Sequence, residues 1–217
     1  MHSSDNQLIL RDQWLTLRER LTGRGLLQPE NASLSLRWPG SETMWLGRKQ
    51  DEMPQAFSTA DVVVSPDEAA ARHAAIYRLR SDVGAIAIGG GVYGAFLGDL
   101  GGVMPQLFDE QARYLGRMGE QVRKTSDLTS ALRRGGNALL MNGAPVCLGP
   151  TATRVAHNAE LFEKCATAYV LAVAAGGSPE QLPWLVRWIA NGRLGKEQRR
   201  AAQNFAAGLL PAESGGY

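Results

Sequence analysis

Three consecutive glycines, Gly89, Gly90 and Gly91, lie between a short apolar run and the start of a helical pattern. Glycine has no Cβ, so a ligand can come close to the main chain there, and the first N–H groups of a helix have no intrahelical partner. Such a turn binds small anions through backbone donors. We therefore predict an anion-binding turn, with simple space filling as the alternative. Tyr93 has the nearest titratable hydroxyl and is a candidate catalytic acid, with packing as the alternative.

The same stretch allows a second interpretation. Gly89, Gly91 and Gly94 satisfy the G-x-G-x-x-G spacing that follows a strand in dinucleotide-binding units. Such a unit needs a parallel strand beyond the helix with an acidic residue near its end, whereas Asp109 and Glu110 lie in a helical pattern. Dinucleotide binding is therefore the weaker interpretation of these glycines.

Hydrophobic periodicity and turn residues predict the elements that position this turn. Ser65 as N-cap, Pro66 in the first turn and Glu68 as the closing acid predict a helix start just before the glycine stretch. Asn142-Gly143 predicts a two-residue hairpin. The predicted helices cover residues 6–21, 66–79, 106–115, 127–134, 151–175, 184–189 and 197–207, and the predicted strands cover 33–37, 43–46, 61–64, 84–88, 138–141 and 145–148.

Composition limits the classes of protein that this chain can belong to. Its 217 residues, 44% of them hydrophobic, predict a single domain over residues 1–217. The net charge of +2 comes without a long run of like charges, and no apolar stretch reaches the roughly 18 residues that span a bilayer. We expect no nucleic-acid partner, no membrane partner and a cytoplasmic location. Cys147 and Cys165 lack metal-site spacing, so we expect buried free thiols.

Several segments, in order, resemble the class II aldolase and adducin head-domain family, which includes fuculose-phosphate aldolases. They are Glu30-Asn-Ala-Ser-Leu-Ser-Leu-Arg37, His73-Ala-Ala-Ile-Tyr77 followed by Arg80-Ser-Asp82, Ala138-Leu-Leu-Met-Asn142, and the late helix 160–176. The resemblance implies an α/β fold of three αβα layers around a largely antiparallel sheet, often assembled as a tetramer. It also implies enzymes that hold a divalent metal on three histidines and act on sugar phosphates and related hydroxy or oxo acids.

The chemistry of that family is not carried over. By the resemblance, the three metal-binding histidines fall on Ile88, Gly90 and Gly143, and the acid-base glutamate falls on Ala69. The three histidines that are present, His2, His73 and His157, offer no substitute by position. We therefore assign no metal and expect no cofactor.

Other positions remain candidates for contact with a substrate. The resemblance places Asn31 and Ser33 at the substrate, and Asn142 would approach from the neighbouring hairpin. Glu68 is next to the lost glutamate and is a candidate catalytic residue, although one residue on a helix is a rotation of about 100° and capping explains it without catalysis. Asp67 and Glu68 replace the family's two phosphate-binding serines, and their charge would repel a phosphate.

Three functions remain open from the sequence. The first is a metal-independent lyase of the aldolase or decarboxylase type, acting on a small hydroxy or oxo acid. The second is a non-catalytic binding or assembly protein like the adducin head. The third is dinucleotide binding through residues 89–94. We expect a small anionic molecule as the ligand and a homotetramer, since Trp184, Leu185 and Trp188 exceed what one helix face buries.

Overall fold

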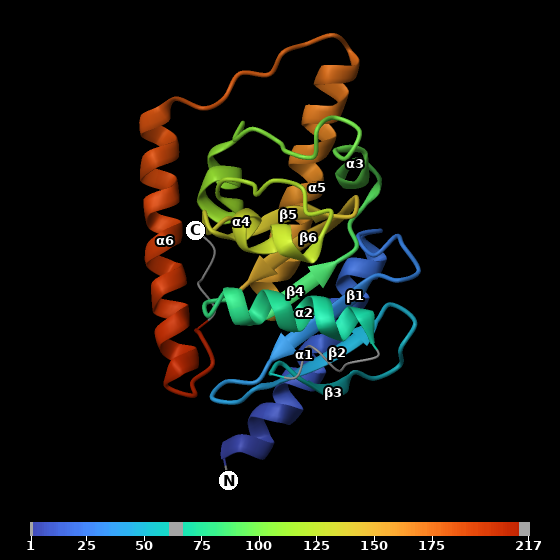
Figure 1. Cartoon of the computed structure of the whole chain (residues 1–217), viewed down its shortest axis with the longest axis vertical. Helices are drawn as coiled ribbons and strands as arrows, with labels where there is room; N and C mark the ends of the chain where they lie inside the picture. The colour runs from blue at the N-terminus through green and yellow to red at the C-terminus, as the bar shows by residue number, and fades with distance from the viewer. Residues whose placement is uncertain (1, 61–66, 213–217) are drawn as a thin grey trace.

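The computed structural model describes residues 2–60 and 67–212. Its centre is one six-stranded sheet in the order β3-β2-β1-β4-β6-β5, and every neighbouring pair is antiparallel (Figure 1). The strands are β1 Ser33–Arg37, β2 Thr43–Arg48, β3 Gln55–Ser58, β4 Ala85–Ile88, β5 Ala138–Met141 and β6 Ala144–Gly149.

Helices cover both faces of the sheet. They are α1 His2–Gly23, α2 Glu68–Leu79, α3 Val92–Phe96, α4 Leu128–Leu132, α5 Ala152–Ala174 and α6 Trp184–Ala206, with a π-helix at Gln111–Leu115 and a 3₁₀ turn at Thr125–Asp127. In Figure 1, α2 lies in front of the sheet, α5 lies behind it, and α6 runs along one side.

Alternation along the strands produces two hydrophobic cores, one on each face. Leu34 and Leu36 of β1 pack with Trp14 of α1 and Phe162 of α5. On the other face, Ile86 and Ile88 of β4 pack with α2 and α4. The three-layer αβα arrangement with an antiparallel sheet is therefore confirmed.

The late helices differ from the prediction. Residues 184–189 and 197–207 do not form two helices but belong to the single helix α6. Gly192 and Gly195 lie inside it, and a helical glycine costs only about 1 kcal/mol relative to alanine. Burial of Leu194, Ala201 and Phe205 against the rest of the chain favours the continuous helix.

Two further predictions need correction. The predicted strand 61–64 lies outside the described residues, and the third strand of this end of the sheet is β3, whose largely exposed side chains produce no clear alternation. Residues 106–108 do not join the predicted helix, which begins at residue 109 and continues into the π-helix. The Gln111 side chain instead accepts a hydrogen bond from the Leu107 N–H (2.8 Å) and donates to the Pro105 carbonyl (2.8 Å), so it takes backbone groups that a helix would use.

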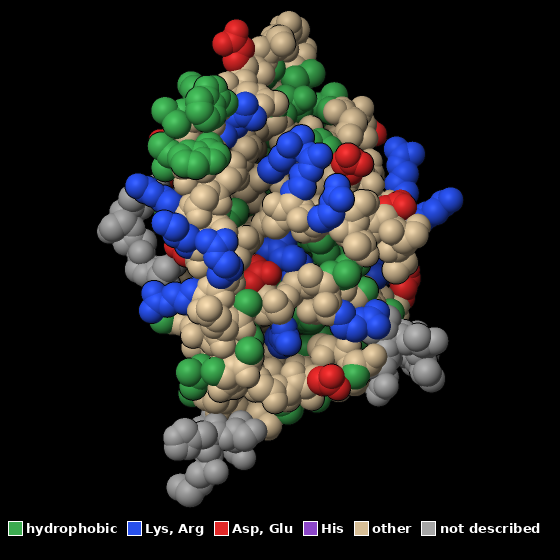
Figure 2. Space-filling model, turned by 60° about the vertical axis from the view of Figure 1, so that its left-hand side comes forward, with side chains coloured by type: hydrophobic (Ala, Val, Ile, Leu, Met, Phe, Trp, Pro, Cys, Tyr) green, Lys and Arg blue, Asp and Glu red, His purple; other side chains and the backbone are tan. Residues whose placement is uncertain are grey.

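The exposed side of α6 is apolar at its start, and the rest of this face of the molecule carries many Lys and Arg side chains (Figure 2). Its first two turns expose Trp184 and Trp188 (69% each) with Leu185 and Ile189. Figure 2 shows hydrophobic side chains gathered at one end of this face of the molecule, with Lys and Arg side chains spread over the rest. Within the described part of the chain, no helix is both long and apolar enough to cross a bilayer.

Candidate functional site

A cavity of about 370 Å³ lies between the first turns of α2, the segment that leads into the 3₁₀ turn, and the end of β5. Alanines, Val122, Leu128 and Met141 form its apolar wall. Its polar lining residues are Glu68, Arg72, Arg123, Lys124, Thr125 and Asn142. Of the sequence-predicted site residues, the structure brings Glu68 and Asn142 together here.

Main-chain hydrogen bonds at the edge of the sheet fix the position of Arg123 and Lys124. Val122 pairs with Met141 of the edge strand β5 as a parallel bridge. Its N–H donates to the Leu140 carbonyl (2.8 Å), and the Asn142 N–H donates to the Val122 carbonyl (2.9 Å). Arg123 and Lys124 come directly after Val122 in the chain, so the binding of Val122 to the sheet positions them at the cavity.

Asn142 is held in the turn between β5 and β6. Its φ is +51° and that of Gly143 is +80°, and positive φ at both central residues is what a type I′ hairpin requires. The predicted Asn-Gly hairpin is thereby confirmed. The turn also places the Asn142 side chain on the cavity lining.

The cavity lining carries three cations and one carboxylate, a net charge of 3 − 1 = +2. Arg72 donates through Nε to the Glu68 carbonyl (3.3 Å), and its Nη2 lies 3.6 Å from Glu68 Oε2. The Glu68 side chain is 83% exposed, whereas that of Arg72 is 23% exposed. An ion pair this exposed contributes less than about 1 kcal/mol, so a ligand carboxylate can replace Glu68 at little cost.

Asp67 caps α2. Ser65 and Pro66, the predicted cap and first-turn residue, lie outside the described residues. The Asp67 carboxylate accepts from the N–H groups of Ala69 (2.8 Å) and Ala70 (3.1 Å) and pairs with Arg48 (2.7 Å). Burial alone would raise the pKa of Asp67, but the hydrogen bonds from Ala70 and Arg48 hold it below its ordinary value. The helix N-terminus thus binds the chain's own anion.

An anion of the chain itself binds the backbone directly after the glycine turn, where the sequence analysis predicted an external ligand. Glu163 of α5 accepts from the N–H groups of Tyr93 (2.8 Å) and Gly94 (3.0 Å). A Cβ on Gly91 would lie 2.5 Å from the Glu163 carboxyl carbon, and one on Gly90 would lie 2.4 Å from the Pro145 ring. Gly89–Gly91 therefore make room for neighbouring side chains and are not among the residues that line the cavity with Asn142.

This arrangement bears on the roles predicted for Tyr93 and for dinucleotide binding. The Tyr93 N–H is used by Glu163, and Tyr93 does not line the cavity that holds Glu68. The G-x-G-x-x-G spacing leads into α3, which has only five residues, and β4 pairs antiparallel with both of its neighbours. The parallel unit that a dinucleotide requires is not formed here.

Ser33 and Asn31 also lie outside the cavity. Ser33 is 2% exposed and is hydrogen-bonded to His73 Nε2 (2.9 Å), while Ser35 is hydrogen-bonded to His73 Nδ1 (2.7 Å) and to the Tyr77 hydroxyl (2.8 Å). Burial lowers the pKa of His73 to about 3, so its ring is neutral. His73 is therefore a hydrogen-bonded core histidine. Asn31 is exposed in the turn before β1.

The residues at the family's metal positions do not fit a metal ion. Ile88 is 4% exposed and packs in the α2-side core, and Gly90 is covered by Pro145. Neither these residues nor Gly143 has a side chain that can coordinate a metal ion. Among residues 2–60 and 67–212 no group of three or more His, Cys, Asp or Glu could hold a metal ion. Cys147 and Cys165 are buried free thiols, as expected, and burial raises the pKa of Cys165 to about 12.

Sequence reasoning missed the three basic residues of the cavity. The adjacent pair Arg123 and Lys124 was the available signal, since two neighbouring cations can form part of an anion site. Arg72 had no such signal, because on α2 it looks like an ordinary exposed helical residue.

Comparisons with known proteins were made by sequence and by structure. No family model matches the sequence, and no curated protein matches it. YgbL from Klebsiella pneumoniae, described as a candidate aldolase, epimerase or decarboxylase, has a TM-score of 0.70 at 19% identity, covering 85% of this chain and 99% of its own.

Two further solved structures have a similar fold. L-fuculose 1-phosphate aldolase from Glaciozyma antarctica PI12 has a TM-score of 0.68 at 14% identity, covering 91% of this chain and 88% of its own. An aldolase II superfamily protein from Pseudomonas syringae has a TM-score of 0.66 at 12% identity, covering 95% of each chain. This chain therefore has the class II aldolase fold that its sequence resemblance predicts.

Proposed function

We propose that this chain binds a small anionic hydroxy or oxo acid in the 370 Å³ cavity beside α2. The observation that carries the proposal is the convergence of Arg72, Arg123 and Lys124 with Asn142 on one cavity. Cations hold a carboxylate through charge-assisted hydrogen bonds, and an amide can donate to a hydroxyl or oxo group beside it. These side chains supply the positive charge that the resembling enzymes obtain from a metal.

Size and charge both favour a small carboxylic acid over a sugar phosphate. The volume lies at the lower end of the range for small-molecule sites, about 300–1,000 Å³. The Asp67 carboxylate already uses the N–H groups of Ala69 and Ala70 that would otherwise face a phosphate. With one negative charge at the helix N-terminus and Glu68 beside it, a phosphate dianion meets more repulsion than a carboxylate does.

A binding experiment tests the proposal. Lactate, glycolate, pyruvate and 2-oxobutyrate are titrated by calorimetry into the wild type and into Lys124→Gln, with Arg78→Gln as the matched control. Arg78 is exposed in the last turn of the same helix α2 and does not line the cavity. We expect Lys124→Gln to weaken binding of the best acid about tenfold and Arg78→Gln to leave it unchanged. Absence of binding by every acid, or equal weakening by both variants, would contradict the proposal.

Metal-independent lyase activity is the second candidate, because Glu68 lines the same cavity with its carboxylate 3.6 Å from Arg72. In this role Glu68 takes the proton of a hydroxyl that lies β to an oxo group, and the bond between the hydroxyl-bearing carbon and the carbon next to the oxo group breaks to give an aldehyde and an enolate. The cations stabilise the enolate, which then takes the proton back from Glu68. A 4-hydroxy-2-oxo acid, which has this arrangement of hydroxyl and oxo group, is incubated with wild type and with Glu68→Gln, and release of pyruvate and an aldehyde is followed by NMR. Product formation that Glu68→Gln abolishes supports catalysis, and binding without product leaves the protein a binding protein.

A further inference from the structure

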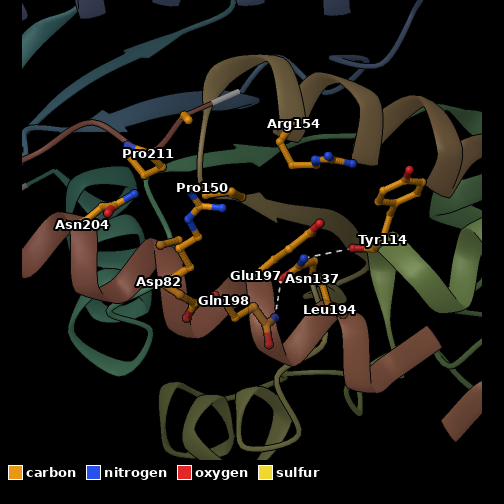
Figure 3. A pocket seen from close by; sticks show the side chains of 13 residues that line it. Asp82, Tyr114, Asn137, Pro150, Arg154, Leu194, Glu197, Gln198, Asn204 and Pro211 are labelled. Atoms are coloured by element: carbon orange, nitrogen blue, oxygen red, sulfur yellow. Dashed lines mark hydrogen bonds between the residues drawn. The ribbon is translucent and has the colours of Figure 1, made fainter. Parts of the chain in front are cut away.

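A second cavity, of about 180 Å³, lies between α6 and the body of the molecule. Figure 3 shows Arg154 reaching into it from the first turn of α5, Glu197 and Gln198 facing it from α6, and Tyr114 at its side. Its lining shares no residue with the cavity beside α2. Any ligand of this cavity is therefore bound by different side chains from those of the proposed acid site.

Hydrogen bonds through one buried amide hold the walls in place. Asn137 is 3% exposed, and its Oδ1 accepts from Arg80 (2.9 Å) and from Gln198 of α6 (3.2 Å). Its Nδ2 donates to the Tyr114 carbonyl (3.0 Å). Asn137 thus ties α6, the π-helix and the start of β5 together. A cavity with walls fixed in this way is formed before a ligand arrives, which lowers the cost of binding.

The charges around this cavity leave a positive excess. Asp82 pairs with both ends of the Arg80 guanidinium (2.8 Å each), and Glu197 pairs with both terminal nitrogens of Arg113. The lining also contains the guanidinium groups of Arg154 and Arg200. Both carboxylates of the lining are therefore already paired with arginines outside it, and among residues 2–60 and 67–212 no carboxylate pairs with Arg200, so its guanidinium can take an external anion.

The arginine nearest to the aromatic wall is positioned for a planar anion. The Arg154 guanidinium lies over the Tyr114 ring, 4.4 Å from its centroid. A guanidinium stacked in this way directs its N–H groups outward in its own plane, which suits the two oxygens of a carboxylate.

Volume and apolar lining limit the size and character of the anion. At about 30 Å³ for each water in the liquid, 180 Å³ corresponds to roughly six water-sized groups. That size suits a small acid better than a nucleotide or a sugar phosphate. Leu194, Ala201 and Pro150 form an apolar wall that an inorganic anion could not use. We infer that this cavity binds a small monocarboxylate with a short apolar chain, independently of the function proposed for the cavity beside α2.

Butyrate and its uncharged analogue butyramide test this inference in an NMR titration of the full chain. The readout is the shift of the side-chain amide signals of Asn137 and Gln198. We expect butyrate to bind saturably with a dissociation constant of about 1 mM, typical of a ligand with six heavy atoms, and butyramide to bind at least about tenfold more weakly. Equal binding of the two compounds, or no saturable shift with butyrate, would overturn the inference.

Three variants that each lose one positive charge test where in the molecule the anion binds. Arg200→Gln should weaken butyrate binding about tenfold, whereas Arg199→Gln, on the neighbouring exposed residue of α6 that does not line the cavity, should leave it unchanged. Arg72→Gln, in the cavity beside α2, should also leave it unchanged. Equal loss in Arg200→Gln and Arg199→Gln, or loss only in Arg72→Gln, would sink the assignment. Circular dichroism and the unfolding midpoint check that Arg200→Gln is folded.

Discussion

Glu163 decides what the glycine turn does. Its carboxylate reaches across from α5 to the N–H groups of Tyr93 and Gly94, and Gly91 and Gly94 leave the space that it fills. The sequence predicted an anion on the N–H groups of Gly89–Gly91, but Gly89 and Gly90 donate to the Pro145 and Leu26 carbonyls, and the N–H groups that bind a carboxylate come from the first turn of α3. The source of the anion could not be read from the local sequence, because Glu163 is 70 residues away from Tyr93 along the chain.

Removing this carboxylate should destabilise the fold. Glu163→Ala leaves two partly buried N–H groups without an acceptor, and we expect a loss of about 1–3 kcal/mol in the free energy of unfolding, measured with urea. Lys164→Ala is the control, since Lys164 is exposed and makes one long surface ion pair (3.4 Å) with Glu110. If both variants lose the same small amount, Glu163 is not the structural anion of this turn.

The neutral His73 predicts how stability depends on pH. Its pKa in the folded protein, about 3, is below the ordinary 6.5, so the unfolded chain binds the proton more strongly between these values. Its contribution to stability is complete above about pH 6.5 and is lost progressively as the pH falls toward 3.

His73→Asn tests this dependence. Between pH 6 and 4.5 the free energy of unfolding of the wild type should fall more steeply than that of His73→Asn, by up to about 1.4 kcal/mol per pH unit. His157→Asn should have a smaller effect, since His157 is only partly buried and burial lowers its pKa less. Identical slopes in wild type and His73→Asn would show that the acid sensitivity arises elsewhere.

At the scale of elements, the parts that local signals control were predictable. The hairpin of β5 and β6 follows from Asn142-Gly143, and α5 begins where the helix 151–175 was predicted, with Thr151 as its N-cap. The elements that depend on distant partners were missed, including the edge strand β3 and the unbroken length of α6. The cavity beside α2 belongs to this second group, because Lys124 reaches it only through the pairing of Val122 with the sheet edge.

Gly192, one of the two glycines inside α6, provides a test of helix continuity. A Cβ added at Gly192 would meet nothing within 4 Å, so Gly192→Ala should stabilise the protein by about 0.5–1 kcal/mol in urea unfolding. Gly91→Ala is the contrasting variant, since its Cβ would meet the Glu163 carboxylate at 2.5 Å, and it should destabilise. A destabilising Gly192→Ala would mean that α6 is broken near this residue in solution.

At the scale of the whole molecule, the unexplained feature is the apolar end of α6. Trp184, Leu185, Trp188 and Ile189 are all at least 45% exposed and lie within two helical turns. Exposed patches of this kind mark interaction surfaces more often than single exposed residues do. The patch is on the opposite side of α6 from Leu194 and Ala201, which pack against the body, so covering it does not require the helix to move.

Self-association is the simplest way to cover this patch, and a homotetramer stays our prediction. Wild type should elute at a mass near 4 × 23.4 kDa by size exclusion with light scattering, and Trp188→Glu should shift it toward the 23.4 kDa monomer because the charge cannot be buried without a partner. Val92→Glu is the control, since Val92 is 55% exposed on α3, away from α6, and should leave the assembly unchanged. A monomeric wild type at micromolar concentration, or an unchanged mass for Trp188→Glu, would show that copies of this chain do not cover the patch.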